Sequence, residues 1–224
     1  MIELLKKVAR KITVPPHEVV GIPYWEERAK QYGARSVLNI SHTAEELAEV
    51  TQMQIRQIFP YLRQELNGSE RVILDYGCGP GRFTKKLANL IHGEAIGVDP
   101  IETLIDMAPR AANVRYELAC EGRIPLMESC VDVVWICLVM GGIVPKAIEP
   151  TCLEIERVLK PGGLLFVVEN TTERKPASEN WSFRSVAQYC EMFASFATLK
   201  HLHDYFDVGE RVSLLAGRKE TRRP

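Results

Sequence analysis

The chain has 224 residues, of which 46% are hydrophobic and 25% are charged, and its formal net charge is −1. This length and composition are typical of one soluble globular domain with a sizeable core. The balanced charge gives no global field to hold nucleic acid or an anionic membrane. Six cysteines are scattered without a C-x-x-C pair, which favours reduced thiols in a cytosolic protein over disulfides or a bound metal. No stretch approaches the roughly 20 apolar residues that stable membrane insertion requires.

Residues 1–66 have helical spacing and are expected to form an N-terminal helical cap segment. The first helix is basic and amphipathic and ends at Pro15 and Pro16. Such a helix packs on its own domain or on a partner subunit more often than it lies on a membrane. Residues 67–224 are expected to complete one compact domain. Two further helices of the cap are predicted over residues 24–32 and 41–66.

From residue 71 onwards, short apolar runs alternate with segments of helical period. This alternation predicts an α/β fold, in which a parallel sheet has helices on both faces. The last two strands are joined by a short loop, so they are expected to form an antiparallel hairpin. Strands are predicted at 71–75, 94–99, 114–118, 131–137, 164–169, 197–203 and 211–219, and helices at 81–91, 101–108, 149–160 and 182–194.

The segment LDYGCGPGR, residues 74–82, follows the first of these strands. Its glycines admit positive φ and let a ligand approach the backbone, and the amides that open the next helix favour an electron-rich group. The spacing G-x-G-x-G differs from the dinucleotide pattern G-x-G-x-x-G, which argues against an NAD-dependent dehydrogenase. No G-K-[ST] follows, so the segment is not a nucleoside-triphosphate loop either.

Two aspartates narrow the class of ligand. Asp75, at the end of the first strand, would repel a pyrophosphate and attract an ammonium. Asp99 ends the second strand, eighteen residues after Gly81, where a carboxylate can accept both ribose hydroxyls. The two together predict a ligand with an adenosine part and an amino-acid part.

Four motifs in order resemble the class I S-adenosylmethionine (SAM)-dependent methyltransferases of the small type 11 kind: LDYGCGPGR, GVDP, CEGRIPLMESCVDVVWICLVM and VLKPGGLLFVVEN. The resemblance covers about residues 71–217. It implies SAM as the cofactor and a Rossmann-like, mostly parallel sheet of seven strands that ends in the antiparallel hairpin.

The same resemblance implies which residues hold SAM. Asp75 and the loop amides would bind its methionine part, and Asp99 its ribose. Cys120 and Glu121 stand where the family usually has a D-A pair that reads the adenine edge. The implied cofactor-binding residues are Tyr32, Asp75, Gly77, Cys78, Gly79, Asp99, Pro100, Ile101, Cys120, Glu121, Ile136 and Cys137.

Methyl transfer requires a base only when the acceptor is a hydroxyl or a protonated amine. Many relatives carry a histidine pair after the fourth strand, whereas this chain has Gly141-Gly142, which is expected to leave room for the acceptor. His42 is the candidate base, although a structural role near a helix start suits it equally well. His201 and His203 alternate on a late strand and are expected to share one face of the sheet.

The acceptor is expected to be a small molecule, by elimination. The [DN]-P-P-[YFW] motif of base-amino methylation and a strongly basic stretch outside the termini are both missing from the sequence, so nucleic acid is not expected as a partner. The sequence therefore predicts a monomeric or homodimeric enzyme that transfers methyl from SAM to O, N or C of a small molecule. The alternative is a SAM-binding protein or partner subunit without turnover.

Overall fold

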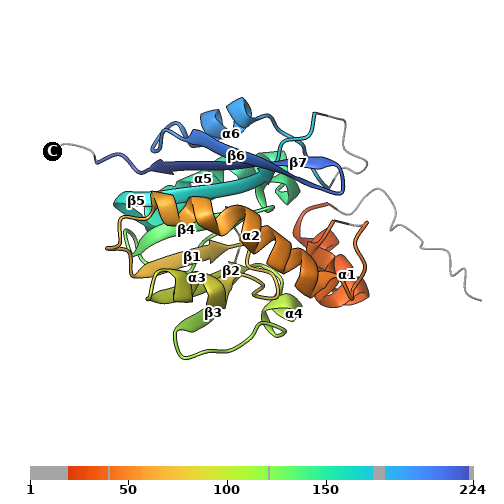
Figure 1. Ribbon diagram of the computed structural model, residues 1–224. Coiled ribbons are helices and arrows are strands. Elements are labelled where there is room, and N and C mark those ends of the chain that lie inside the picture. Colours follow the sequence, from red (N-terminus) through yellow and green to blue (C-terminus); the bar gives the residue numbers. More distant parts are fainter. Residues whose placement is uncertain (1–19, 40, 121, 174–179, 222–224) are drawn as a thin grey trace, which may run out of the picture.

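The structure is a computed structural model, and it describes residues 20–39, 41–120, 122–173 and 180–221 (Figure 1). Seven strands form one sheet in the order β3-β2-β1-β4-β5-β7-β6. The first five strands pair in parallel, and β7 is antiparallel to both of its neighbours, so the predicted fold class is confirmed. The strands are β1 (Val72–Tyr76), β2 (Glu94–Asp99), β3 (Val114–Leu118), β4 (Val131–Cys137), β5 (Leu159–Asn170), β6 (Lys200–Asp207) and β7 (Glu210–Arg218).

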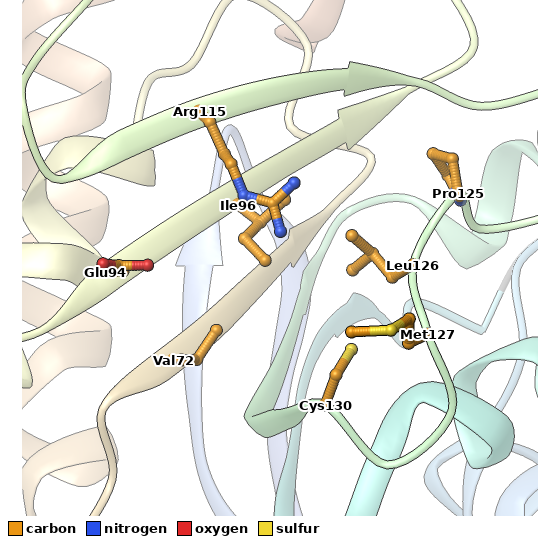
Figure 2. Close-up of a pocket in the computed structure, with 8 residues that line it drawn as sticks. All are labelled: Val72, Glu94, Ile96, Arg115, Pro125, Leu126, Met127 and Cys130. Atoms are coloured by element: carbon orange, nitrogen blue, oxygen red, sulfur yellow. The ribbon is translucent and has the colours of Figure 1, made fainter.

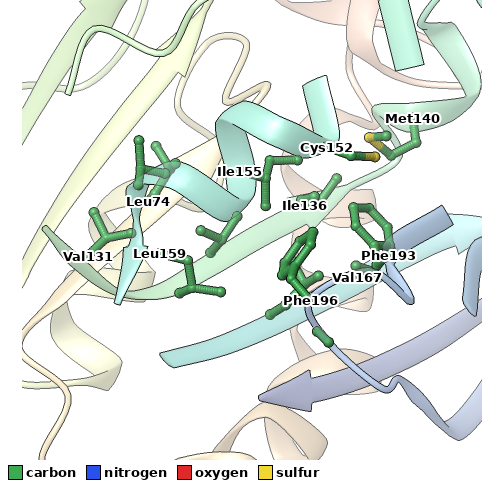
Figure 3. Packing of buried hydrophobic residues seen from close by; sticks show 14 of the residues in the cluster. Leu74, Val131, Ile136, Met140, Cys152, Ile155, Leu159, Val167, Phe193 and Phe196 are labelled. Atoms are coloured by element: carbon green, nitrogen blue, oxygen red, sulfur yellow. The ribbon is translucent and has the colours of Figure 1, made fainter. Parts of the chain in front are cut away.

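Helices cover both faces of this sheet. On one face, Ile58 and Leu62 of α2 and Leu87 of α3 pack against the strands. On the other face, α5 and α6 build the second cluster, shown in Figure 3. The helices are α1 (Ile22–Tyr32), α2 (Leu47–Glu65), α3 (Thr84–Leu90), α4 (Glu102–Ile105), α5 (Pro145–Val158) and α6 (Val186–Phe193), with 3-10 turns η1 (Gly33–Val37) and η2 (Met140–Gly142).

Several boundaries differ from those predicted from the sequence. Helix α5 begins at Pro145, because proline suits the first turn of a helix. It ends at Val158 and not at residue 160, and Leu159 pairs with Val131 at the start of β5. Strand β6 begins at Lys200, where pairing with Ala216 of β7 starts. The ends of these elements depend on pairing between strands that are distant in the chain, which the local sequence pattern does not show.

The expectation that His201 and His203 share a face is wrong. Their partners on β7 are the adjacent residues Leu215 and Leu214, because the register shifts between the two histidines. Such a bulge turns the two side chains to opposite faces of the strand. His203 stacks on the Tyr61 ring of α2 at 4.6 Å between centroids, and His201 lies 2.7 Å from Asp204.

The described residues between β3 and β4 form no helix, and a cavity of about 240 Å³ lies beside them (Figure 2). Val72 and Glu94 line it at the amino ends of β1 and β2, so it lies far from the carboxyl ends where Asp75 and Asp99 stand. Among the residues that the structure describes, no helix is long and apolar enough to cross a membrane. The helix predicted before Pro15 lies outside the described residues.

Candidate functional site

A glycine loop connects the carboxyl end of β1 to α3. The amides of Gly77 and Cys78 donate to the Val98 carbonyl at 2.8 and 3.1 Å, which ties the loop to the end of β2. Gly77 has a φ of 71°, and a Cβ there would lie 2.4 Å from Cγ2 of Val139. Glycine is therefore required here by the backbone conformation and by the close approach of the segment that follows β4.

Asp75 is the penultimate residue of β1, next to this loop, and is only 3% exposed. The hydroxyl of Thr84 donates to its Oδ2 at 2.6 Å. Burial raises the pKa of Asp75 from 3.8 to about 7, although the Thr84 hydrogen bond and the nearby Arg82 charge both lower it. A desolvated carboxylate of this kind gains stability from an additional cation.

Asp99 stands at the end of the neighbouring strand β2 and is also buried. Its Oδ2 accepts the Gly79 amide at 2.8 Å, and its Oδ1 accepts the Ile101 amide at 2.9 Å. Burial raises the pKa of Asp99 to about 6, and the two amides act in the opposite direction. Each oxygen of an ionised carboxylate has a second lone pair, so Asp99 can accept two further donors.

The residues predicted to contact adenine lie near this acid. Ile101 is buried with Leu104 of α4 and Ala29 of α1, and Pro100 is partly exposed. Cys120 is exposed and forms a short bridge with Arg123. Glu121 lies outside the described residues.

At the end of β4, Ile136 and Cys137 turn to opposite faces of the sheet. Ile136 is fully buried in the cluster with α5, whereas Cys137 is partly exposed and packs against the cluster with α2 and α3. Burial raises the pKa of the Cys137 thiol, so this side chain stays neutral.

The cap segment closes over the carboxyl edge of the sheet, where Figure 1 places α1 next to α4. Val37 of η1 reaches the glycine loop, because a Cβ at Gly79 would lie 2.9 Å from its Cγ1. Tyr32, at the end of α1, has the guanidinium carbons of Arg28 and Arg35 over its ring at 5.5 and 5.3 Å from the centroid. The predicted cap residues therefore lie on the same side of the sheet as the loop.

Two tryptophans pack against the segment after β4, and no sequence pattern predicted that they would meet. A Cβ at Gly141 would lie 2.5 Å from the Trp181 ring, and a Cβ at Gly142 would lie 2.7 Å from the Trp25 ring. The two rings meet edge to face at 6.3 Å between centroids, and Trp25 Nε1 donates to the Gly142 carbonyl at 3.2 Å. The room beside the glycine pair, which was expected for the acceptor, is filled by these rings.

Glu169, the penultimate residue of β5, holds the same segment through hydrogen bonds. Its Oε1 accepts the amides of Val139 and Met140, each at 2.7 Å, and the side chain is fully buried. Burial raises the pKa of Glu169 from 4.5 to about 7, against these amide bonds and the charge of Arg184. In the sequence, the only sign of this role is a polar residue at the end of an apolar run.

His42 lies in the connection between η1 and α2. Its Nε2 is 2.8 Å from Oδ1 of Asp207, and Arg35 Nε donates to its backbone carbonyl at 2.7 Å. Asp207 is the last residue of β6, and no sequence pattern pointed to it. The described residues contain no group of three or more His, Cys, Asp or Glu side chains arranged to hold a metal ion.

Part of the chain is similar to known methyltransferases. Residues 73–163 match the family described as methyltransferase domain. Ribosomal RNA-processing protein 8 of Rattus norvegicus is 36% identical over 100 residues, which are 44% of this chain and 18% of that protein. Phosphoethanolamine N-methyltransferase 1 of Triticum aestivum is 23% identical over 202 residues, which are 85% of this chain and 38% of that protein. The chain thus spans less than half the length of either relative.

A solved structure shares the fold. Human N-acetylserotonin methyltransferase in complex with SAM superposes with a TM-score of 0.61 at 18% identity, covering 79% of this chain and 55% of that chain. At this level of identity the likeness concerns the arrangement of strands and helices.

Proposed function

We propose that the protein transfers a methyl group from SAM to O, N or C of a small molecule, because residues 73–163 match the methyltransferase-domain family. The observation that carries the proposal is the pair of buried carboxylates, Asp75 and Asp99, on either side of the glycine loop. SAM, when bound, supplies an electrophilic methyl group on a sulfonium that leaves readily.

The chemistry of the loop suits this cofactor. Burial raises the pKa of Asp75 to about 7, and its carboxylate would bind the ammonium of the methionine part. Each oxygen of Asp99 accepts one backbone amide and has a second lone pair, with which it would accept a hydrogen bond from one ribose hydroxyl. The adenine would lie along Pro100 and Ile101 toward Cys120, and the methionine end would lie beside the glycine loop toward Tyr32 and Cys137.

The closed cap supports a small acceptor. Val37 packs on the glycine loop, and Trp25 is bonded to the segment after β4, so an acceptor must fit beneath these elements. A folded RNA would need a wide, positively charged approach. The names of the relatives point to acceptors of different classes, ribosomal RNA and phosphoethanolamine, and the cap favours the smaller class.

The cofactor proposal is tested with S-adenosylhomocysteine, the demethylated product, by isothermal titration calorimetry. We expect binding by the wild-type protein and a loss of at least about tenfold in Asp99→Ala, because the variant lacks the ribose acceptor. Glu102→Ala, an exposed acidic residue three positions later, is the matched control and should bind normally. Unchanged affinity in Asp99→Ala would contradict the assignment, as would stronger competition by NAD.

The acceptor proposal is tested by transfer from tritium-labelled SAM into two fractions of a cell extract, small metabolites and purified RNA. Label in the metabolite fraction supports the proposal, and label only in RNA would overturn it. Tight binding of S-adenosylhomocysteine with transfer into neither fraction would favour the alternative function, a SAM-binding protein without turnover.

A further inference from the structure

We propose that Asp207 is a positioning residue for His42, and that the acceptor carries a hydroxyl or an ammonium group, which must lose a proton during transfer. This inference rests on the methyltransferase function proposed above. The geometry that carries it is the contact of 2.8 Å between Nε2 of His42 and Oδ1 of Asp207. The two side chains are 13% and 8% exposed, so the pair is largely withdrawn from water.

The pair lies at the functional edge of the sheet. Strand β6 is antiparallel to β7, and β7 is antiparallel to β5, so β6 runs in the same direction as β5. Asp207, the last residue of β6, therefore stands at the edge where β1 and β2 present Asp75 and Asp99. The side chain of His42 reaches this edge from the cap segment.

A half-buried arginine lies between this pair and the glycine loop. Arg82 directly follows the loop, and its Nη1 donates to Thr51 Oγ1 and Gln54 Oε1 of α2 at 3.2 and 2.9 Å. Burial lowers the pKa of Arg82, and the charges of Asp75 and Asp207 both act to raise it. The guanidinium thus interacts with the acid beside the cofactor loop and with the acid beside His42.

The charged neighbours of the imidazole leave one nitrogen able to take a proton. Asp207 faces Nε2, which holds the Nε2–H tautomer and places the lone pair on Nδ1. Glu46 faces Nδ1 with its Oε2 at 3.8 Å, too far for a hydrogen bond. Arg35 Nε donates to the backbone carbonyl of His42. Burial raises the pKa of Tyr205, and the charge of Asp207 raises it further.

In the transfer step, Nδ1 of His42 accepts the proton of the acceptor's O–H or N–H bond. The electron pair of that bond forms the new bond to the methyl carbon, while the pair of the carbon–sulfur bond stays on sulfur. One positive charge disappears from the sulfonium and one appears on the imidazolium, which Asp207 stabilises. A carbanion, or any other acceptor that is already deprotonated, would not require a general base.

The chain contains a second histidine–aspartate pair that serves as a control. His201 Nε2 lies 2.7 Å from Asp204 Oδ1 on the same strand, but the two side chains are 41% and 30% exposed. This pair has the same chemistry without the burial and stands away from the carboxyl edge. His201→Gln should therefore leave transfer unchanged.

The test measures transfer from tritium-labelled SAM into the metabolite fraction, from pH 5.5 to 9, for wild type and for His42→Gln, Asp207→Asn, Asp207→Glu and His201→Gln. We expect a loss of about 100-fold or more in maximal rate for His42→Gln and of roughly 10- to 100-fold for Asp207→Asn. Asp207→Asn should also move the acidic limb of the rate profile to lower pH, because the imidazolium loses its counter-charge. Asp207→Glu should recover part of the rate, and the affinity for S-adenosylhomocysteine should stay within twofold throughout.

The outcomes separate this inference from the proposed function. Transfer by wild type that His42→Gln leaves unchanged overturns the inference alone. Asp207→Asn could also lose transfer rate without a shift of the pH profile and lose S-adenosylhomocysteine affinity to the same extent. That result would mean that the His42–Asp207 pair only holds the cap segment in place, and it would also overturn the inference. Binding by wild type without any transfer overturns both proposals. If Asp207→Asn does not fold, His42→Gln and Asp207→Glu still decide the matter.

Discussion

Replacing Asp75 by asparagine is expected to stabilise the cofactor-free protein while abolishing tight cofactor binding. The folded state holds this carboxyl with a pKa raised by burial from 3.8 to about 7. An unfolded chain at pH 7 has the same group almost fully ionised, so the folded state binds more protons. Stability must therefore fall as the pH rises from about 4 to about 7.

The size of the effect follows from the two pKa values. A change of this extent corresponds to about 4 kcal/mol at most, reached near pH 7 and above. Asparagine is isosteric, can still accept the hydrogen bond from Thr84, and carries no charge to desolvate. We expect Asp75→Asn to gain about 1–4 kcal/mol at pH 7.5, and the gain should vanish near pH 4.

The assay is urea denaturation of wild type and variant at several pH values between 4 and 8, without ligand. Asp99 and Glu169, whose pKa values burial also raises, are present in both proteins, so their contributions cancel in the difference. Asp106→Asn, at an exposed position, controls for the change of charge and should stay within about 0.5 kcal/mol.

The same variant should lose affinity for S-adenosylhomocysteine by at least about tenfold, because an amide cannot neutralise the ligand's ammonium. Calorimetry at pH 7 in two buffers of different ionisation enthalpy should detect a proton released by the wild type on binding. A variant less stable than wild type at pH 7.5, or a stability difference independent of pH, would refute the reasoning about Asp75.

Three further substitutions follow from the geometry around the loop. Gly77→Ala should destabilise the fold by about 2–4 kcal/mol in urea denaturation, because an alanine there has an unfavourable positive φ and its Cβ contacts Val139. Gly68→Ala is the control, because Gly68 has a φ of 86° and a Cβ there would meet nothing within 4 Å. This control should lose only the backbone contribution, about 1 kcal/mol. Gly141→Ala should displace the Trp181 ring, seen as a shift in tryptophan emission, and an unchanged spectrum would count against that contact. Glu169→Ala should cost about 1–3 kcal/mol in thermal or urea unfolding, since it leaves the buried amides of Val139 and Met140 unpaired, and a neutral result would mean that this segment is held by other contacts.

The sequence alone determined the sheet and placed the glycine loop and its two acids at one edge of it. Apolar runs separated by helical periods define the parallel strands, and the short final loop defines the antiparallel pair, because each of these signals is local. The glycine loop and the two acids could be read for the same reason: they stand at strand ends, and parallel strands bring their carboxyl ends to one edge.

Only the tertiary structure decided which distant residues meet at the carboxyl edge of the sheet. His42 and Asp207 are 165 positions apart in the chain, and Trp25 and Gly142 are 117 apart, so no local spacing connects them. The bulge that separates His201 from His203 also depends on pairing with β7, not on the sequence of β6 alone. Residues that act through the backbone of one strand or loop are visible in sequence, whereas contacts between distant elements exist only after those elements have packed together.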